Sequence, residues 1–550
     1  MLAGRVSLVL AFLLASTASA ATLPPGGRDA AAERALKVIK THPSVGRLAA
    51  ADRLAARNVV VDADGTEHVR FERRYAGLRV IGADLLVHSR GGRLKSASTS
   101  LRSTLKLSTR PRLAADDAVL IAGAEFGLGF GSLPETELVV YAKGGRTPRL
   151  SWQVRFQGVN ADSSFADMSY VVDAMSGAIL DRWSNAYFAK GGSMKPGTGS
   201  TSCLSVKSSN GEGQTLYAGT VTLPTVLCGS SYELRDVVRN IRTNDMRNGT
   251  VGDGVVFTDA DNRWGRGRAS DRTSAGADAH YGVVTASDYF SQAHGRAGFD
   301  GQGGSVLAKV HFGDGYNGAF WLEGCNCIAF GDGDGRNWGP LVNLDIAGHE
   351  LSHGVTSHTA GLIYSGESGA INEATSDIFG AMVEFHAGNA LDTPDYMIGE
   401  EFFLKNVPGS ATQKALRYMW DPMKDGGSPG CYHSNVGLLD VHMGSGVANH
   451  FFYLLAEGSG AKSFGGMDHR SPTCDGSQLS GIGRDKAAKI WFRALTVHMS
   501  SDTDYHGARL ATLAAAADLF GDGSSEAAAV AAAWGAVSVY GSRPARACFS

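Results

Sequence analysis

His349-Glu350-Leu351-Ser352-His353 is the stretch on which the interpretation of the whole sequence depends. On a helix, residues four apart lie about one turn apart, so both imidazoles project from the same face. Zn²⁺ favours neutral imidazole, and a catalytic zinc takes three protein ligands plus water. Glu350 follows the first histidine, where its carboxylate can reach that water as a general base. The alternative is a chance match on an amphipathic helix, which the neighbouring sequence has to exclude.

A second helix is predicted over 369–380, because apolar residues recur there at helical spacing. Glu373 and Asp377 lie one turn apart on this helix. Glu373 comes twenty residues after His353, which leaves room for a helix end, a loop and a return, so it can be the third zinc ligand. Asp377 can then hold a ligand imidazole from behind. A solvated acidic face is the alternative, but both carboxylates sit in an otherwise apolar, alanine-rich helix.

The segments 348–356, 360–364 and 367–374 resemble the thermolysin-like neutral metalloproteases. They read Gly-His-Glu-Leu-Ser-His-Gly-Val-Thr, Ala-Gly-Leu-Ile-Tyr and Glu-Ser-Gly-Ala-Ile-Asn-Glu-Ala, and the resemblance extends more loosely over almost the whole chain. It implies a secreted zinc endopeptidase made as a preproprotein. The implied fold is α+β and multidomain. An α+β pro-region precedes a catalytic unit with a β-rich N-terminal lobe, a mostly α-helical C-terminal lobe and the zinc helix between them.

The composition agrees with an exported protein of several domains. The chain has 550 residues and a formal net charge of −3, which gives no case for nucleic acid or an anionic membrane surface as partner. Residues 1–20 are predicted to be a signal peptide, with Arg5, a short apolar core at 6–15 and Ala18-Ser19-Ala20 for cleavage. The alternative is a membrane anchor, but this apolar core is too short to span a bilayer. We therefore expect a secreted protein that leaves the membrane once the signal is removed.

Residues 21–190 form a separate predicted unit that contains no metal or nucleophile constellation. The unit is similar to the family's pro-region, which acts as an intramolecular chaperone and inhibitor. A permanent binding domain is the alternative. Its alternating apolar pattern predicts strands at 71–88, 149–156 and 169–180, and a helix at 114–126.

A linker follows this unit at 191–200, where Gly, Ser and Pro predominate. Such a composition suits a cleavable segment, and we place the mature N-terminus within 185–200. The β-rich lobe is then expected at 191–345, and the zinc helix with the helical lobe at 346–550. The zinc helix should begin near Asn343 or Asp345 and run past His358. Further helices are expected at 485–499, 505–520 and 525–540.

The β-rich lobe contains the predicted substrate-binding edge. The stretch 315–321, Gly-Tyr-Asn-Gly-Ala-Phe-Trp, resembles the family's edge strand, which binds extended substrate through backbone pairing. Asn317 and Ala319 are therefore expected to contact substrate. Gly318 stands where the family usually has a substrate-binding Asn. Elsewhere in this lobe we expect a helix at 278–294 with His280 as a structural residue, and a hairpin turn rather than a calcium loop at 331–335.

The resemblance assigns further residues around the predicted zinc. Tyr364 and His442 are expected to stabilise the oxyanion of the tetrahedral intermediate. The family's Asp five residues before that His is Gly437 here, so Asp440 is the nearest candidate to orient His442. The remaining assignments are Arg417 for a substrate carbonyl past the scissile bond, Ile346 and Leu416 for an apolar side chain after the cut, and Asn372 with Asp377 as supports behind the ligands.

A calcium site is implied at four carboxylates of the catalytic unit, because Ca²⁺ takes six to eight oxygen ligands. Family members that bind two calcium ions carry Glu where this chain has Met397, so we predict one calcium ion. A further site of some relatives would match 259–263, but Arg263 replaces an oxygen donor there. The four expected calcium ligands are Asp345, Glu384, Asp395 and Glu400.

The seven cysteines suit an oxidising compartment, and an odd number leaves at least one outside an intrachain pair. Sequence proximity suggests the pairs Cys203–Cys228 and Cys431–Cys474. Cys548 could pair with Cys325 or Cys327, or stay unpaired. The stretch 426–430, Gly-Gly-Ser-Pro-Gly, fits the letters of a serine-nucleophile elbow, but Pro and Gly predict a loop instead of the required strand-turn-helix.

These residues predict a mechanism for peptide hydrolysis. Zinc lowers the pKa of the attacking water toward about 7, and Glu350 accepts its proton and passes it to the leaving amine. Two other classes remain open: an inactive homologue used as a binding protein, and an exopeptidase for short peptides. The expected partners are protein or peptide substrates and the chain's own pro-region, and we expect the mature enzyme to be a monomer.

Overall fold

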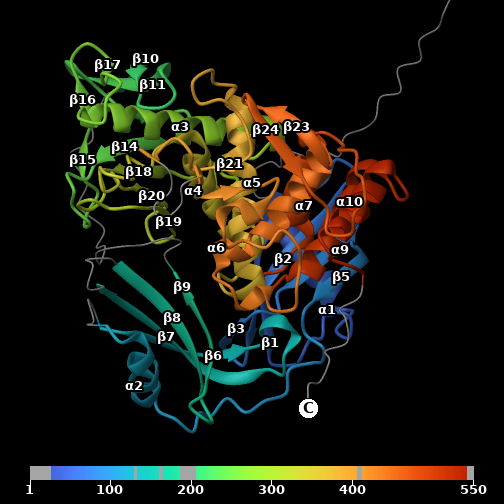
Figure 1. Cartoon of the computed structure of the whole chain (residues 1–550). Helices are drawn as coiled ribbons and strands as arrows, with labels where there is room; N and C mark the ends of the chain where they lie inside the picture. Colours follow the sequence, from blue (N-terminus) through green and yellow to red (C-terminus); the bar gives the residue numbers. More distant parts are fainter. Residues whose placement is uncertain (1–26, 129–132, 160–164, 186–205, 406–411, 542–550) are drawn as a thin grey trace, which may run out of the picture.

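A computed structural model describes residues 27–128, 133–159, 165–185, 206–405 and 412–541 (Figure 1). The predicted signal peptide, the linker at 191–200, Cys203 and Cys548 lie outside these residues. Figure 1 shows a β-rich lobe, a helical lobe and, beneath and behind them, the N-terminal unit. The α+β multidomain prediction is therefore confirmed.

The N-terminal unit is built on one long sheet with the strand order β5-β4-β2-β3-β6-β7-β8-β9, and β1 pairs with β2. Helix α1 covers one half of the sheet around Phe71, Leu85 and Val87, and α2 covers the other half around Phe156. Its helices are α1 (Gly27–Lys40) and α2 (Ala115–Phe126). Its strands are β1 (Asp52–Val61), β2 (Thr66–Tyr75), β3 (Leu78–Ile81), β4 (Leu85–Arg90), β5 (Arg93–Thr99), β6 (Glu135–Tyr141), β7 (Arg149–Val159), β8 (Phe165–Asp173) and β9 (Ile179–Ser184).

The β-rich lobe contains two sheets and the long helix α3 (Arg272–His294). One sheet has the order β16-β12-β11-β10-β17; the other has the order β13-β14-β18-β20-β19, with β15 on β14. The predicted helix at 278–294 begins six residues earlier than expected, because Asp271 caps it by accepting from the Thr273 amide at 3.1 Å. The strands are β10 (Val206–Gln214), β11 (Thr220–Cys228), β12 (Ser231–Glu233), β13 (Arg235–Asp236), β14 (Ile241–Asp245), β15 (Val255–Val256), β16 (Thr258–Asp259), β17 (Arg263–Trp264), β18 (Val306–Val310), β19 (Ala319–Leu322) and β20 (Cys327–Phe330).

The helical lobe starts with the two helices that carry the predicted zinc ligands. Helix α4 ends at Ser357, so the prediction that it runs past His358 is wrong. The hairpin β23–β24 was not predicted. Helices and turns of this lobe are α4 (Leu344–Ser357), α5 (Gly366–Ala387), η2 (Pro422–Asp425), η3 (Val436–Leu438), α6 (Val441–Gly444), α7 (Gly446–Glu457), α8 (Arg484–Arg493), the π-helical turn η4 (Ala494–His498), α9 (Tyr505–Phe520) and α10 (Ser525–Ala536). Its short strands are β21 (Met397–Ile398), β22 (Arg417–Tyr418), β23 (Gly460–Phe464) and β24 (Met467–Ser471).

Helices α4 and α5 pack unusually close together because glycines meet at their crossing. A Cβ atom added to Gly348 would lie 3.0 Å from the Cα of Gly380. A Cβ added to Gly380 would lie 2.6 Å from the carbonyl oxygen of Asp345, which is backbone and cannot move aside. On the other side of α4, a Cβ on Gly282 of α3 would meet Ala347 at 2.6 Å. The zinc helix is therefore held tightly from both sides.

Two features of the β-rich lobe bear on the sequence predictions: the loop after β20 and His280 on α3. Strand β20 leads into a loop closed by Asp334, whose Oδ1 accepts from the amides of Arg336, Asn337 and Trp338, and the described residues up to α4 form no partner strand. The hairpin predicted at 331–335 is therefore wrong. His280 bonds Thr243 and the carbonyl of Pro224, which confirms its structural role.

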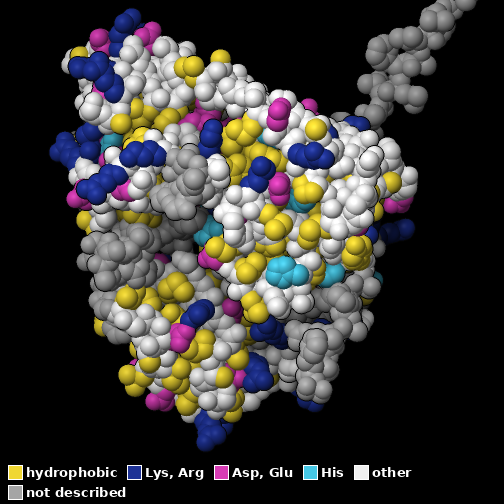
Figure 2. Space-filling model, in the orientation of Figure 1, with side chains coloured by type: hydrophobic (Ala, Val, Ile, Leu, Met, Phe, Trp, Pro, Cys, Tyr) yellow, Lys and Arg dark blue, Asp and Glu magenta, His cyan; other side chains and the backbone are white. Residues whose placement is uncertain are grey.

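Disulfides connect Cys431 with Cys474, as predicted, and Cys325 with Cys327. A bond from Cys548 to Cys325 or Cys327 is thereby excluded. Cys228 is also disulfide-bonded. Figure 2 shows basic and acidic side chains interspersed on one face, in keeping with the net charge of −3. Within the described part of the chain, every helix is too short or too polar to cross a bilayer.

Candidate active site

His349, His353 and Glu373 come together between α4 and α5. The two Nε2 atoms are 3.1 Å apart, and the Glu373 carboxylate oxygens lie 3.5 Å from His349 Nε2 and 3.4 Å from His353 Nε2. All three side chains are buried, and their ligand atoms lie within 4.8 Å of one another. This is the group that the sequence predicted from two separate helices.

The chemistry of this group fits Zn²⁺. His349 Nδ1 donates to Asp377 and His353 Nδ1 donates to Asn372, each at 2.9 Å, so both Nε2 atoms keep their lone pairs. Burial lowers the pKa of His353 to about 3, which keeps this imidazole neutral. Two lone pairs and a carboxylate that face one another without a proton between the imidazoles call for a cation. Asn372 and Asp377 thus lie where the sequence placed them, behind the imidazoles.

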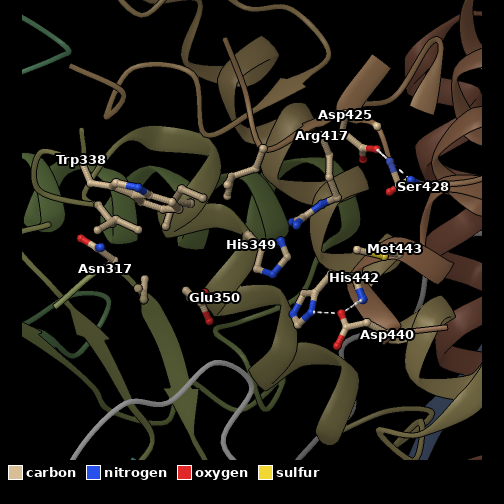
Figure 3. Close-up of a pocket in the computed structure, with 17 residues that line it drawn as sticks. Asn317, Trp338, His349, Glu350, Arg417, Asp425, Ser428, Asp440, His442 and Met443 are labelled. Carbon is tan, nitrogen blue, oxygen red and sulfur yellow. Dashed lines mark hydrogen bonds and ion pairs between the residues drawn. The ribbon is translucent and has the colours of Figure 1, made fainter. Parts of the chain in front are cut away.

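Glu350 lies on α4 with its carboxyl group directed into a cavity of about 390 Å³ (Figure 3). The side chain is only 2% exposed, and its Oε2 has no hydrogen-bond partner in the described part of the protein. Burial and the nearby Glu373 raise the pKa of Glu350 well above its ordinary value. A buried carboxyl group with an unused oxygen and a raised pKa is suited to exchange a proton with a bound molecule.

Tyr364 and His442 both contact the carboxylate of Glu373. The Tyr364 hydroxyl donates to Glu373 and lies 3.0 Å from His442 Nε2. His442 Nε2 in turn lies 3.3 Å from Glu373. Asp440 accepts from His442 Nδ1 at 2.7 Å and also caps α6 by accepting from the His442 amide. The structure therefore brings Asp440 to the position from which it was expected to orient His442.

Arg417 has contacts that the sequence did not suggest. Its Nε and Nη2 each donate to Asp377 at 2.7 Å, and Asn449 Nδ2 donates to the same carboxylate at 2.7 Å. Burial alone would raise the pKa of Asp377, but the charge of Arg417 and the bonds from Arg417 and His349 hold it well below its usual range. Arg417 also lines the cavity, so its expected contact with substrate remains compatible with this role.

Sequence reasoning missed Asn449. The residue is buried on α7 within an otherwise apolar run of Val, Ala, Phe and Leu, which was the available signal. His450, its neighbour, bonds the carbonyl of Gly430 and the hydroxyl of Ser471, and is a packing residue as expected. Ser428 lies in a loop after η2 as predicted, but it unexpectedly lines the cavity.

The cavity is apolar on one side and polar on the other (Figure 3). The predicted substrate residues Asn317, Ala319, Ile346 and Leu416 all line it. Strand β19 begins at Ala319 and lies at the end of its sheet, so Asn317 just precedes the edge strand. Gly318, which the sequence placed at the substrate edge, lines it too, and the lining residues that the sequence did not suggest are Trp338, Leu341, Asp425, Gly426, Gly427, Ser428 and Met443.

Gly318 has a steric reason that was not visible in the sequence. A Cβ atom at this position would lie 2.8 Å from the Tyr316 hydroxyl and 2.9 Å from the adjacent ring carbon. The Tyr316 ring is itself buried against Phe312 and Phe320. The space that an Asn side chain would need next to the backbone is therefore already filled.

A second polar centre, formed by buried carboxylates, includes one residue of α4 and one of α5. The expected calcium ligands form two groups that share Glu384: one adds Asp345 and Glu401, the other adds Asp395 and Glu400. Glu401 was not predicted. Both carboxylate oxygens of Glu384 and of Glu400 lack a hydrogen-bond partner within the described residues. Burial and mutual repulsion raise the pKa of both side chains.

The N-terminal unit contacts the candidate active site at Ser365, next to Tyr364. Asp181 accepts from the hydroxyl of Ser365 at 3.0 Å, and Lys143 donates to the Ser365 carbonyl at 2.8 Å. Ser365 is the neighbour of Tyr364. Ile363 packs against a buried cluster of the N-terminal sheet that is formed by Ile81, Val139, Tyr141 and Val171. The unit therefore contacts the segment that carries one of the candidate oxyanion-stabilising residues.

Comparison with known families identifies three matching segments. Residues 210–357 match the thermolysin metallopeptidase catalytic domain, and residues 360–539 match the thermolysin metallopeptidase alpha-helical domain. Residues 52–101 match the fungalysin/thermolysin propeptide motif.

Similar proteins span most of this chain. A transglutaminase-activating metalloprotease of Streptomyces mobaraensis is 42% identical over 519 residues, which cover 93% of this chain but only 64% of that protein. Thermolysin of Alicyclobacillus acidocaldarius subsp. acidocaldarius is 35% identical over 540 residues, covering 94% of this chain and 91% of the relative. Among solved structures, the precursor of protealysin from Serratia proteamaculans is 30% identical, with a TM-score of 0.42 over 54% of this chain and 87% of that one.

Proposed function

This chain belongs to the thermolysin family of metallopeptidases, and from this premise we propose that it is the secreted precursor of a monomeric endopeptidase that cuts before bulky apolar residues. It is a zinc metalloendopeptidase with a propeptide. The observation that carries the finer proposal is the position of Glu350, whose unpartnered carboxyl oxygen points into a cavity beside the His349, His353 and Glu373 group.

Zinc is assigned to His349, His353 and Glu373, on the fit of their lone pairs described above. A bound zinc ion would supply a Lewis acid that polarises the scissile carbonyl and makes the attacking water more acidic. Asp377 and Asn372 keep the two imidazoles in the tautomer that leaves Nε2 available.

Glu350 is proposed as the general base. Its carboxylate accepts the proton of the attacking water and then delivers this proton to the leaving amine. Its raised pKa favours the first step, because a carboxylate with a higher pKa is a stronger base toward the proton of the attacking water.

Tyr364 and His442 are proposed to stabilise the oxyanion. The Tyr364 hydroxyl and His442 Nε2 are 3.0 Å apart, so one substrate oxygen can accept from both. The bond between His442 Nδ1 and Asp440 holds the ring with Nε2 toward the Tyr364 hydroxyl.

The specificity proposal rests on the apolar side of the cavity. Ile346, Leu341 and Leu416 can receive a bulky apolar side chain that follows the scissile bond. Among the described residues β19 has no strand on its outer side, and this edge can pair with the extended substrate backbone at Asn317 and Ala319. With glycine at 318, recognition there depends on backbone atoms alone.

We place the signal peptide at 1–20, the pro-region at 21–190 and the mature N-terminus within 185–200. The contacts of Asp181 and Lys143 with Ser365 support an inhibitory pro-region, since they tie it to the residue next to Tyr364. The β-rich lobe is placed at 191–345, and the zinc helix with the helical lobe at 346–550.

One calcium ion is proposed at Asp345, Glu384, Asp395 and Glu400, with Glu401 as an additional ligand. Support comes from the buried carboxylate oxygens that lack partners, because Ca²⁺ is the hard cation that such oxygens favour. The two carboxylate groups share Glu384, which supports a single ion between them, and metal analysis of the folded protein should find one calcium per chain.

The test is Glu350→Gln in the full-length chain. We expect zinc to stay bound, since the substituted side chain is not a ligand, and hydrolysis of internal bonds in a terminally blocked peptide to fall by roughly 10²–10⁴-fold. Zinc is measured by elemental analysis and cleavage by mass spectrometry.

Glu323→Gln, at an exposed glutamate between β19 and β20, is the matched control and should keep full activity. Retained hydrolysis in Glu350→Gln would refute the assigned base. Cleavage only at free peptide ends would favour an exopeptidase, and an inert wild type with zinc bound would favour a binding protein.

A further inference from the structure

Three histidines meet where the pro-region docks on the helical lobe. His68 on β2 and His88 on β4 belong to the pro-region, and His498 ends η4 of the helical lobe. The Nδ1 atoms of His68 and His88 are 2.7 Å apart, and the ring centroids of His88 and His498 are 5.6 Å apart. Figure 1 shows β2 behind α9, in keeping with this contact.

Charged groups surround the histidines from every element packed on them. Arg493 of α8 donates to Asp62, which follows β1, at 2.7 and 2.8 Å, and to Asp518 of α9 at 2.7 Å. His68 Nε2 lies 2.9 Å from Asp62, and His498 Nε2 lies 2.9 Å from Asp518. With neutral histidines, the two carboxylates and one guanidinium leave one net negative charge.

While the pro-region stays docked, the cluster of His68, His88 and His498 can take up only one further proton at low cost in free energy. A single hydrogen can lie between the two Nδ1 atoms, so His68 and His88 cannot both be doubly protonated while they remain in contact. One proton on the cluster neutralises its net charge, and a second one creates a buried excess of positive charge beside Arg493, whose Nη2 lies 3.1 Å from His68 Nε2.

Burial also disfavours the protonated forms of His88 and His498. It lowers the pKa of His88 to about 3, with His68 and His498 adding to the effect, and it lowers the pKa of His498 although Asp518 opposes this. Once the pro-region moves away, His88 and His498 return toward an ordinary pKa of about 6.5. The undocked protein therefore binds more protons than the docked one below this pH.

We propose that His68, His88 and His498 make docking of the pro-region pH-dependent, firm at neutral pH and loosened in mild acid. The inference deepens the proposed zymogen and rests on it for its regulatory meaning. A group whose pKa is depressed in the docked state favours docking above its undocked pKa, and this contribution is lost as the pH falls below about 6.5. Asp62, with a pKa of about 2, does not titrate in this window.

The experiment follows hydrogen exchange in the full-length Glu350→Gln chain at pH 7.5 and 5.5. Two amides bond across the contact without using a histidine: Ser501 donates to Asp84 at 2.8 Å, and Gly144 donates to Asp502 at 2.9 Å. After correction for intrinsic rates, we expect their protection to fall about tenfold for each histidine that takes up a proton on opening. The amide of Thr243, which bonds Leu234 inside the β-rich lobe, should not respond.

Two substitutions assign the effect. His88→Gln and His498→Gln each keep a polar side chain that cannot take up a proton, and each should remove about tenfold of the pH response. His42→Gln is the control, at an exposed histidine of the pro-region outside the cluster. If one cluster variant does not fold, the other and the wild-type response still decide the question.

The proposal is overturned if protection of the Ser501 and Gly144 amides changes less than twofold between the two pH values with the cluster intact, or if it falls as much in both cluster variants as it does with the cluster intact. The proposed function is judged separately in the same sample. Self-cleavage of the Glu350→Gln chain, seen as a change in mass, would contradict the assigned base and leave the docking result standing.

Discussion

At the scale of single residues, the candidate site depends on what holds Asp377. This carboxylate accepts from His349, from Arg417 twice and from Asn449, and all of these side chains are buried. Its position fixes the ring plane of His349 and thereby the direction of one zinc-ligating lone pair. Asn449 is therefore a positioning residue, since it acts on the ligand only through Asp377.

Asn449→Ala should weaken zinc binding by roughly 10-fold, the lower end of what loss of an outer hydrogen bond costs at such sites. Zinc affinity is measured by competition with a chelator of known strength. Once zinc is saturating, kcat should fall while KM stays unchanged, because Asn449 does not line the cavity. Asn435→Ala, at an exposed position, is the control. Unchanged zinc affinity in Asn449→Ala would refute the role.

The residues that sequence reasoning found and missed differ in one physical respect. His349, His353, Glu373 and Asp377 follow helical spacing on two neighbouring segments, so periodicity placed each pair on one helix face, and the family resemblance implied that the two faces meet. The contacts of Arg417 with Asp377, and of Gly318 with Tyr316, depend on how side chains from separate loops fill space. No periodic pattern encodes such packing.

At the scale of elements, the crossing of α4 and α5 determines the ligand geometry. Two ligands come from α4 and the third from α5, so any change in the separation of these helices moves Glu373 relative to both imidazoles. Gly348 and Gly380 allow this crossing to be close.

Gly380→Ala should therefore be costly for both folding and zinc binding. The new Cβ would lie 2.6 Å from the Asp345 carbonyl, and we expect the free energy of unfolding to fall by about 1–3 kcal/mol, as in other overpacked cores. Urea denaturation and zinc content are the measurements. Gly535→Ala on α10 is the matched control, since nothing lies within 4 Å of its added Cβ, and it should be neutral or slightly stabilising. Equal behaviour of the two variants would contradict the packing argument.

Elements with a strong period were predictable and those without one were not. The zinc helix, the helix of Glu373 and the helix at 505–520 were expected where they occur, apart from their ends. The start of α3 was missed because Arg272, Thr273 and Ser274 are polar and only the cap at Asp271 includes them in the helix. The hairpin β23–β24 is largely polar and exposed, so alternation gave no signal there.

At the scale of the whole molecule, buried carboxylates make stability depend on calcium. Burial raises the pKa of Asp345 to about 8 and those of Asp392 and Asp395 to about 6, against ordinary values near 4. A raised pKa in the folded state means that the calcium-free protein loses stability as the pH rises from about 4 through these values.

Removal of calcium by dialysis into calcium-free buffer that contains zinc should therefore lower Tm more at pH 8 than at pH 5. For Asp395 alone, the shift from about 4 to about 6 corresponds to a penalty on the order of 3 kcal/mol above pH 6. The measurement is a thermal melt across pH 5–8 with and without calcium. A calcium effect of the same size at both pH values would contradict the proposed site.

The order of the domains could be predicted from the resemblance, but their docking could not. Asp62 and Arg493 are 431 residues apart in sequence, and the three histidines of the pro-region contact come from segments that look unremarkable on their own. Such long-range pairs arise from the shapes of two folded units, which a reading of local patterns does not contain.

Arg493 also determines what happens to the two parts after they separate. When the pro-region leaves, Arg493 stays paired with Asp518 within the helical lobe. Asp62 leaves with the pro-region and loses its ion pair with Arg493. The departing fragment therefore carries a carboxylate that attracts it back toward Arg493. Because dissolved salt screens attraction between exposed charges beyond about 10 Å at 0.1 M, recapture of the fragment should slow as ionic strength rises, and dilute media should prolong its residence on the enzyme.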